Sequence, residues 1–391
     1  MSFKLLKTSK KSKARLGTLK TAHGIIHTPF FMPIATKGSV KALRTEDLKK
    51  LGAEIILSNT YHLFFKPGMQ ILKKAKGIHG LMDWHLPVLT DSGGYQVFSL
   101  GGNKEYGGEK KNLVKITERG VEFRSVYDGS KHIFTPKKVL EIQEAIGSDI
   151  RMILDVCSPS DSSHEQAEKD LNTTLRWAKA SQTAHVETHN YVSLPKSKHL
   201  LFGIVQGALF KDLRLKSVEA LTKMKFDGYS IGGLAVGESM PEMYKVLDYT
   251  APALPQDKPR YLMGVGYPEQ ILESVKRGID MFDCVIPTRE ARHGRLYLWN
   301  SPSLRAKRSN PAFPAKFYHT VNIDSAKFAK DFSPINAKSK LPELRNHTKA
   351  YLRHLFSAQE PLALQLATLN NVEFYLDLMA KIRQAIKAEK L

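Results

Sequence analysis

Eight short apolar runs, separated by amphipathic stretches, constrain the fold of this chain more than any other feature. The runs are Ile25–Thr36, Ala53–Asn59, Leu86–Asp91, Ile150–Val156, Leu200–Gln206, Gly228–Leu234, Tyr261–Gly266 and Met281–Pro287. Near-continuous hydrophobicity is typical of strands buried on both faces, and helical patterns between such strands indicate parallel crossovers. Helical patterns cover Pro136–Ile146, His164–Val186, Lys211–Met224, Pro241–Tyr249 and Pro268–Gly278. Eight such units predict an α/β protein with a closed (β/α)8 TIM barrel. The alternative, an open doubly wound sheet, needs a glycine-rich phosphate-binding turn after an early strand, and the sequence lacks one.

The remaining segments predict how the chain is divided. Residues 1–298 would form the barrel core, with insertions near 101–134, where Gly101–Lys111 reads as a mobile loop and Val121–Phe134 as a hairpin around an Asp-Gly turn. Residues 299–316 are rich in Pro, Ser and basic residues and would form an exposed insertion. Residues 317–391 would form a small C-terminal helical appendage with the closing helices.

Charge and composition narrow the function. Lys and Arg number 59 against 38 Asp and Glu, which gives a net charge of +21. This excess favours a polyanionic partner, nucleic acid before membrane, over a charge that only confers solubility. No apolar run of 18 residues is present, the basic N-terminus lacks the apolar segment of a secretory signal, and two cysteines cannot build a disulfide framework. We therefore expect a cytoplasmic protein without a membrane span.

The apolar runs tend to end in a polar residue or glycine. These residues are Asn59, Asp91, Asp155, Gln206, Gly233, Gly264 and Asp283. In a barrel, the carboxyl ends of all strands meet on the face where active sites are built. A single terminal Asp is most often a helix cap, but several acidic and amide side chains at equivalent ends favour a shared site.

The residue types at these ends indicate a reaction class. Asp91 and Asp283 form a carboxylate pair suited to attack on an anomeric carbon combined with proton transfer. Asp155 and Gln206, with the backbone of Gly232 and Gly233, complement the hydrogen-bonding edge of guanine. Tyr95 and Met263 could hold a flat base between them. Together with the basic charge, this pattern predicts glycosidic exchange on a nucleic acid.

Several long motifs resemble one known family. They are SNTYHL at 58–63, TDSGGYQVFS at 90–99, FGIVQG at 202–207, GGLAVGE at 232–238, YLMGVG at 261–266 and DMFDCVIPTR at 280–289. They are similar to the tRNA-guanine transglycosylases (queuine tRNA-ribosyltransferases) of bacteria, from about Arg15 to Arg295 and again over Tyr351–Met379. The resemblance implies a TIM-barrel pentosyltransferase of queuosine biosynthesis. Such an enzyme replaces the wobble guanine of tRNAs with GU(N) anticodons (Asp, Asn, His, Tyr) by preQ1, 7-aminomethyl-7-deazaguanine. It does so by double displacement through a covalent enzyme–RNA intermediate.

The resemblance also implies roles for individual residues. Asp283 would be the nucleophile and Asp91 the general acid/base, while Asn59 would steady a neighbouring carboxylate or contact ribose. The substrate-binding set would be Asp91, Ser92, Gly93, Gly94, Tyr95, Asp155, Gln206, Gly233, Met263 and Asn59. The RNA-binding set would be Gly264, Val265, Gly266, Tyr267, Pro268, Glu269 and Gln270, with Thr288, Arg289, Glu290, Ala291 and Arg292. The planar guanidinium forks of Arg289 and Arg292 suit phosphates or bases beside the wobble position.

The chain departs from the family at its zinc site. The family places three cysteines before the segment that corresponds to KAYLRHL here and a histidine after it. The corresponding residues are Ser339, Leu341, Leu344 and Asn370. Zinc needs thiolate or imidazole donors, so we expect no metal cofactor and apolar packing in its place. The homodimer of the family involves this region, which leaves the oligomeric state open here.

A second departure concerns the choice of base. Val156 stands where the resemblance leads us to expect a glutamate that helps tune the backbone that meets the aminomethyl group, although Ala235, Val236 and Glu238 follow the bacterial pattern. PreQ1 is therefore the first expectation and queuine the alternative. A non-catalytic tRNA-binding paralogue and a sugar-phosphate barrel enzyme are the rival classes. The presence of both Asp91 and Asp283 favours an exchange enzyme over the paralogue. A sugar-phosphate enzyme would leave the net charge of +21 and the Arg289–Arg292 cluster unexplained.

Overall fold

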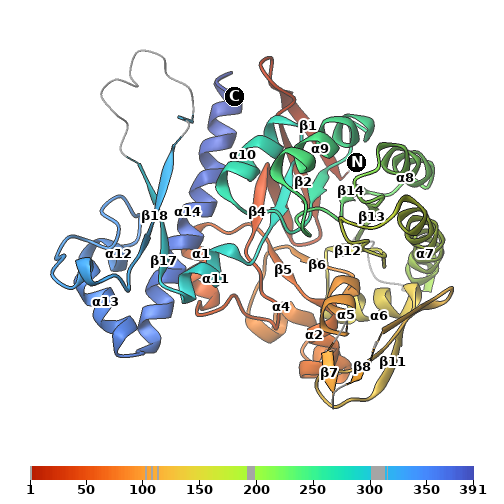
Figure 1. Ribbon diagram of the computed structural model, residues 1–391, viewed down its shortest axis with the longest axis horizontal. Helices are drawn as coiled ribbons and strands as arrows, with labels where there is room; N and C mark the ends of the chain where they lie inside the picture. Colours follow the sequence, from red (N-terminus) through yellow and green to blue (C-terminus); the bar gives the residue numbers. More distant parts are fainter. Residues whose placement is uncertain are drawn as a thin grey trace.

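The protein is described by a computed structural model that covers residues 2–101, 104–106, 109–111, 114–191, 199–300, 313–314 and 316–391 (Figure 1). Its centre is an eight-stranded parallel sheet, with one strand from each of the eight apolar runs. In sheet order the strands are β4 (Phe30–Met32), β16 (Met281–Asp283), β15 (Arg260–Leu262), β14 (Gly228–Ile231), β13 (Leu200–Val205), β12 (Ile150–Met152), β6 (Val88–Thr90) and β5 (Ile56–Ser58). The two end strands meet, because the amide of Ala35 donates to the carbonyl of Leu57 (2.7 Å) and the amide of Leu57 to the carbonyl of Pro33 (3.0 Å). The predicted TIM barrel is confirmed.

Helices connect the strands. They are α1 (Thr45–Leu51), α2 (Thr60–Leu63), the π-helical turn η1 (Phe64–Gly68), α3 (Met69–Lys74), α4 (Gly77–Met82), α5 (Gly94–Gly101), α6 (Pro136–Ile146), α7 (His164–Tyr191), α8 (Lys211–Lys223), α9 (Met240–Ala253), α10 (Pro268–Lys276) and α11 (Ile286–Arg292). Five of them, α6 to α10, lie where the patterns predict. Local signals set their ends. In α6, Thr135 caps the amide of Lys138, Pro136 occupies the first turn, and Gly147 ends the helix at φ +81°. None of the described helices is both long and apolar enough to cross a membrane.

The insertion after β6 contains two small antiparallel sheets. The predicted hairpin is confirmed as β10 (Gly120–Arg124) paired with β11 (Lys131–Phe134), and β9 (Val114–Thr117) joins it. Within the segment predicted as a mobile loop, β7 (Lys104–Tyr106) pairs with β8 (Glu109–Lys111). Antiparallel pairing of two three-residue segments satisfies backbone groups that the composition alone assigned to a loop.

An antiparallel sheet of β1 (Phe3–Thr8), β2 (Arg15–Thr21) and β3 (Gly24–Thr28) covers the amino ends of the barrel strands. Arg15 contacts Asp280 just before β16, and His23 contacts Asp149 just before β12. The expectation of one barrel strand across Ile25–Thr36 is therefore wrong in part. The run divides at Pro29, which has no amide hydrogen to continue a ladder, so β3 joins the covering sheet and only β4 joins the barrel.

The C-terminal appendage lies beside the barrel (Figure 1). It contains β17 (Arg295–Trp299), β18 (Tyr318–Asn322), the short helix η3 (Ala326–Phe328), α12 (Pro342–Asn346) and α13 (Lys349–Ser357). The long helix α14 (Pro361–Lys387) joins it to the barrel, where the ring of Tyr375 packs 4.9 Å from that of Phe31. The helical character predicted for the end of the chain is confirmed. Residues 301–312 and 315, which make up most of the expected basic insertion, lie outside the described residues.

Candidate active site

All seven polar or glycine residues at the ends of the apolar runs line one cavity of about 420 Å³ at the carboxyl end of the barrel. These lining residues are Asn59, Asp91, Asp155, Gln206, Gly233, Gly264 and Asp283. Tyr95, Ser92 and Met263 also line it. Gly93 and Gly94 are buried beside Asp91 and are not among the lining residues. Parallel topology is what brings residues from distant parts of the sequence to one mouth.

Asp283 ends β16 and is 8% exposed. Its Oδ1 accepts hydrogen bonds from the hydroxyl of Tyr261 (2.6 Å) and the amide of Gly264 (2.8 Å). Its Oδ2 has no hydrogen-bond partner among the described residues. Burial raises the pKa of Asp283, and the two donors oppose that rise. The carboxylate is thus held firmly through one oxygen, and the other stays available for bonding.

Asp91 follows β6 and is fixed by three neutral donors. Its Oδ1 accepts from the amides of Thr60 (2.9 Å) and Gly93 (3.2 Å), and the side-chain amide of Asn59 donates to Oδ2. Burial raises the pKa of Asp91 to about 7, and the nearby charge of Asp283 adds to the rise. A carboxyl group with a pKa near neutrality can both give and accept a proton. Of the two roles expected for Asn59, contact with a carboxylate is present.

Asp155 and Gln206 form a polar pair in the wall of the cavity. The amide group of Gln206 donates from Nε2 to Oδ2 of Asp155 (2.7 Å), and the hydroxyl of Ser92 donates to Oδ1 (3.2 Å). Burial raises the pKa of Asp155 to about 6. The Oε1 atom of Gln206 is buried without a hydrogen-bond partner. These two residues therefore offer acceptors and a donor to a polar ligand.

The mouth of the cavity carries the two residues expected to hold a flat base. The side chain of Tyr95 is 55% exposed, and that of Met263 is half-buried. Among the described residues, no lysine, arginine or histidine lies within ion-pair distance of the three cavity aspartates. The site is thus a set of three acids, two buried and one half-buried, that are held by neutral donors.

The candidate RNA-binding residues follow β15 and β16 around the mouth. Gly264 and Val285 line the cavity, while Tyr267 and Arg289 are exposed. The Nη1 atom of Arg292 donates to the carbonyl of Thr288 (2.9 Å), and the residue is half-buried. Five members of the set are buried and offer RNA little surface. They are Val265, Gly266, Pro268, Thr288 and Ala291. Glu269 accepts from the hydroxyl of Tyr318 (2.6 Å), Gln270 Oε1 accepts from the amide of Tyr267 (3.3 Å), and Glu290 pairs with Arg295 (2.9 Å).

Sequence reasoning gave no role to three residues that fix the site. Tyr261 and Thr60 donate to the two aspartates, and the guanidinium of Arg214 contacts the backbone beneath Gly233. Tyr261 and Thr60 stood inside recognised motifs, and that is the signal that could have found them. Arg214 lies in a helical pattern without a motif.

The four positions at which the resemblance implies zinc ligands offer no metal-binding set. Leu341 and Leu344 are buried in an apolar cluster. Ser339 donates to Oε2 of Glu373 (2.5 Å), and Asn370 accepts from the side chain of Asn336 (3.0 Å). Two leucines cannot bind zinc, so the residues present do not fit the ion.

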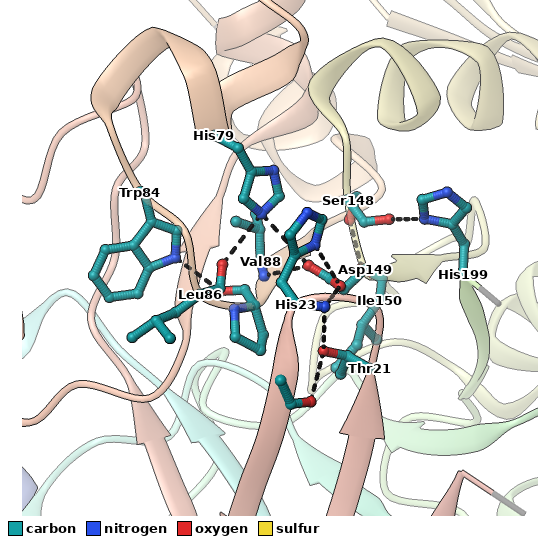
Figure 2. A network of polar contacts seen from close by, with 12 residues as sticks. Thr21, His23, His79, Trp84, Leu86, Val88, Ser148, Asp149, Ile150 and His199 are labelled. Carbon is teal, nitrogen blue, oxygen red and sulfur yellow. Dashed lines mark hydrogen bonds and ion pairs between the residues drawn. The ribbon is translucent and has the colours of Figure 1, made fainter. Parts of the chain in front are cut away.

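One other group could be read as a metal centre. Within the described ranges, only His23, His79 and Asp149 bring three potential ligand atoms within 4.8 Å of one another. Figure 2 shows this group at the amino end of the barrel. The carboxylate of Asp149 lies beside both histidines and also accepts from the amide of Val88. The imidazole rings are stacked, with centroids 3.8 Å apart and 20° between their planes. Nearly parallel rings cannot aim in-plane lone pairs at one ion. The ring nitrogen Nδ1 of His23 instead bonds to Asp149 (2.9 Å), and Nε2 of His79 bonds to the carbonyl of Leu86 (3.1 Å).

Comparison with known proteins gives a consistent picture. A family model described as Queuine tRNA-ribosyltransferase matches residues 9–391. A protein of that name from Caldanaerobacter subterraneus is 46% identical over 391 residues, which cover 100% of this chain and 95% of the relative. Another from Aquifex aeolicus is 47% identical over 392 residues, covering 99% of this chain and 96% of the relative. One from Ruminiclostridium cellulolyticum is 46% identical over 391 residues, again covering 100% and 95%.

Proposed function

Because the chain belongs to the queuine tRNA-ribosyltransferase family and is thus a tRNA-guanine transglycosylase, we propose which exchange it performs and how. It replaces guanine with preQ1 at the wobble position of tRNAs with GU(N) anticodons. The observation that carries the proposal is one cavity lined by both Asp91 and Asp283. This favours an active enzyme over a non-catalytic paralogue. A sugar-phosphate enzyme would need a phosphate cradle, and the cavity aspartates repel phosphate.

The reaction proceeds in two displacements at ribose C1′ of the wobble nucleotide. Asp283 attacks C1′ through its unpartnered oxygen, the C1′–N9 bond of guanine breaks, and Asp91 gives its proton to the departing N9. The intermediate is an ester between Asp283 and the ribose. The incoming base then loses its N9 proton to Asp91 and attacks C1′, which releases Asp283 as carboxylate. The pKa of about 7 at Asp91 supports both proton transfers.

Base recognition rests on Asp155, Gln206 and the Gly233 amide. The carboxylate of Asp155 accepts from N1–H and the 2-amino group, and donors from Gln206 and Gly233 meet O6. The Gln206 amide donates to Oδ2 of Asp155 (2.7 Å), and a bound base would take over this contact.

The choice of preQ1 rests on the backbone at the far side of the cavity. Leu234, Ala235 and Val236 line it, and Glu238 accepts from the amides of Ala235 (2.5 Å) and Val236 (3.1 Å). An acidic group behind this segment suits a cationic aminomethyl substituent. Val156 is buried and is not among the residues that line the cavity, so its side chain does not itself meet the base.

Competition between two bases tests the proposal. The protein is incubated with an unmodified tRNA carrying a GU(N) anticodon, and incorporation of labelled preQ1 is compared with that of labelled queuine. We expect preQ1 to enter at the wobble position and queuine to enter more slowly. Faster entry of queuine would make queuine the substrate, and inertness toward both bases would contradict the assignment.

We also propose that the appendage folds without zinc. Support comes from Leu341 and Leu344 in an apolar cluster and from the Ser339–Glu373 hydrogen bond. Elemental analysis of the purified protein should find no stoichiometric zinc. One zinc ion per chain would contradict this.

A further inference from the structure

The strongest unexplained feature is a buried arginine beneath the base pocket. Arg214 in α8 is 0% exposed, and no carboxylate lies within ion-pair distance of it in the described part of the chain. Its guanidinium donates only to backbone carbonyls: Nε to Ala208 (2.8 Å), Nη1 to Val205 (2.9 Å) and Gly232 (2.7 Å), and Nη2 to Gly233 (3.2 Å). Burial lowers the pKa of Arg214 to about 10, which still leaves it charged at neutral pH.

A buried cation stabilises the fold less than an apolar side chain would at the same position. An ion removed from water without a counter-ion is destabilising unless hydrogen bonds replace its hydration. Four carbonyl acceptors supply that replacement, and they come from the last residue of β13 and from the segments that follow β13 and β14. The same segments carry Gln206 and Gly233. The arginine therefore ties together two walls of the base pocket.

Peptide geometry shows what this tie fixes. In a trans peptide the carbonyl of one residue and the amide hydrogen of the next point in opposite directions. Because the Gly232 carbonyl is held by Arg214, the Gly233 amide points away from Arg214. Gly233 itself lies at φ +64°, and an added Cβ would stand 2.5 Å from Oε1 of Gln206. A glycine here could turn easily, and the guanidinium holds the peptides on both sides of it.

We propose that Arg214 is a positioning residue that sets base specificity by aiming the Gly233 amide at O6 of the bound purine. This inference rests on the base pocket proposed above. Without the guanidinium of Arg214, the peptide between Gly232 and Gly233 would turn. The pocket would then lose the Gly233 amide as a donor that distinguishes a 6-oxo from a 6-amino purine. The chemistry at Asp91 and Asp283 would remain intact.

The test is a specificity ratio, because a ratio does not depend on how much protein is folded. Labelled guanine exchange into tRNA is measured with 2,6-diaminopurine as competitor, and its inhibition constant is divided by the KM for guanine. Arg214→Met should lower this ratio by about 3- to 10-fold, the effect of one hydrogen bond, with kcat per folded molecule within about 3-fold of wild type. Arg214→Lys should recover part of the ratio, because an ammonium group reaches fewer of the carbonyls.

Two further variants separate the outcomes. Arg260→Met removes another buried guanidinium bonded to a carbonyl, that of Leu254 (2.8 Å), at the amino end of β15, and should leave the ratio unchanged. Gln206→Glu alters the pocket directly and should raise the KM for guanine. If the Arg214 variants keep the wild-type ratio while Gln206→Glu shifts the KM, the role of Arg214 is refuted and the pocket stands. If Gln206→Glu has no effect either, the proposed pocket fails. Should Arg214→Met not fold, a wild-type ratio in Arg214→Lys overturns the inference.

Discussion

The two ends of the barrel bury carboxylates in opposite ways. At the amino end, Asp280 is paired with Arg15, and Asp149 accepts from His23 (2.9 Å) and from the amide of Val88 (2.9 Å). The pKa of Asp149 is lowered, because the bonds to His23 and Val88 outweigh burial, whereas burial raises the pKa of Asp280 in spite of its pairing with Arg15. At the carboxyl end, Asp91, Asp155 and Asp283 have only neutral donors, and the pKa of each is raised. The first end uses buried acids to join segments, and the second keeps them uncompensated for reaction.

The difference between the two ends of the barrel is clearest at the two ends of β16. Asp280 stands before β16 and Asp283 ends it, and both are buried. A matched amide substitution at each end therefore separates the contribution of a carboxylate to chemistry from its contribution to stability.

Asp283→Asn should produce the largest effect on activity. An amide cannot form the ester with ribose, so we expect exchange to fall by more than about 10⁴-fold. Stability should hold or rise, because a buried charge is removed and Asn still accepts from Tyr261 and Gly264. Labelled guanine exchange and thermal unfolding measure the two quantities. A substantial loss of thermal stability in Asp283→Asn would mean that the carboxylate at the carboxyl end also stabilises the fold, which would contradict the difference between the two ends.

Asp280→Asn should produce the largest effect on stability. It leaves Arg15 as a buried cation without its partner, which costs about 3–5 kcal/mol of unfolding free energy. Exchange per folded molecule should stay close to wild type. Urea unfolding monitored by circular dichroism, with the exchange rate corrected for folded fraction, checks both parts. Lost activity in fully folded protein would contradict the division of roles.

Asp91 predicts a pH dependence at the mouth. Guanine release needs Asp91 protonated, so single-turnover release should slow as pH rises through about 7, while attack by the incoming base should quicken. Asp91→Asn should abolish both dependences and slow exchange by about 10²- to 10⁴-fold. The pKa of Asp91 is higher in the folded than in the unfolded chain. Wild type should therefore lose stability relative to this variant as the pH rises from about 4 to about 7. A pH-independent release step in wild type would refute the acid role.

The smallest expected effect is electrostatic. Arg289 is exposed at the mouth, whereas Lys20 is exposed on the covering sheet at the other end. Arg289→Ala should reduce the slope of log affinity for tRNA against log salt by about 0.7–0.9, and Lys20→Ala should leave it unchanged. Fluorescence anisotropy over a salt series measures both slopes. Equal changes would indicate that the whole surface, not the mouth, holds the RNA.

The sequence predicted the barrel and its mouth because both follow from local patterns. Each apolar run can be recognised from its own residues. Parallel strands place their carboxyl ends on one face of the barrel, and this brings Asp91 and Asp283 to one cavity. Relations between distant backbone groups were not visible. Arg214 stands in an ordinary helical pattern, and its burial depends on carbonyls that follow two separate strands. Pro29 divides the apolar run Ile25–Thr36 between two sheets, and the hydrophobic pattern of the run gives no sign of this division.

The central claim is that Asp283, at the carboxyl end of its strand, carries the RNA during exchange. The most direct measurement traps the protein with tRNA in the absence of free base, digests the adduct with trypsin and nuclease, and locates the ribose by mass spectrometry. One tryptic peptide, residues 278–289, contains both Asp280 and Asp283. We expect the ribose on Asp283. A ribose on Asp91 or Asp280, or no covalent adduct under conditions in which exchange proceeds, would contradict the account.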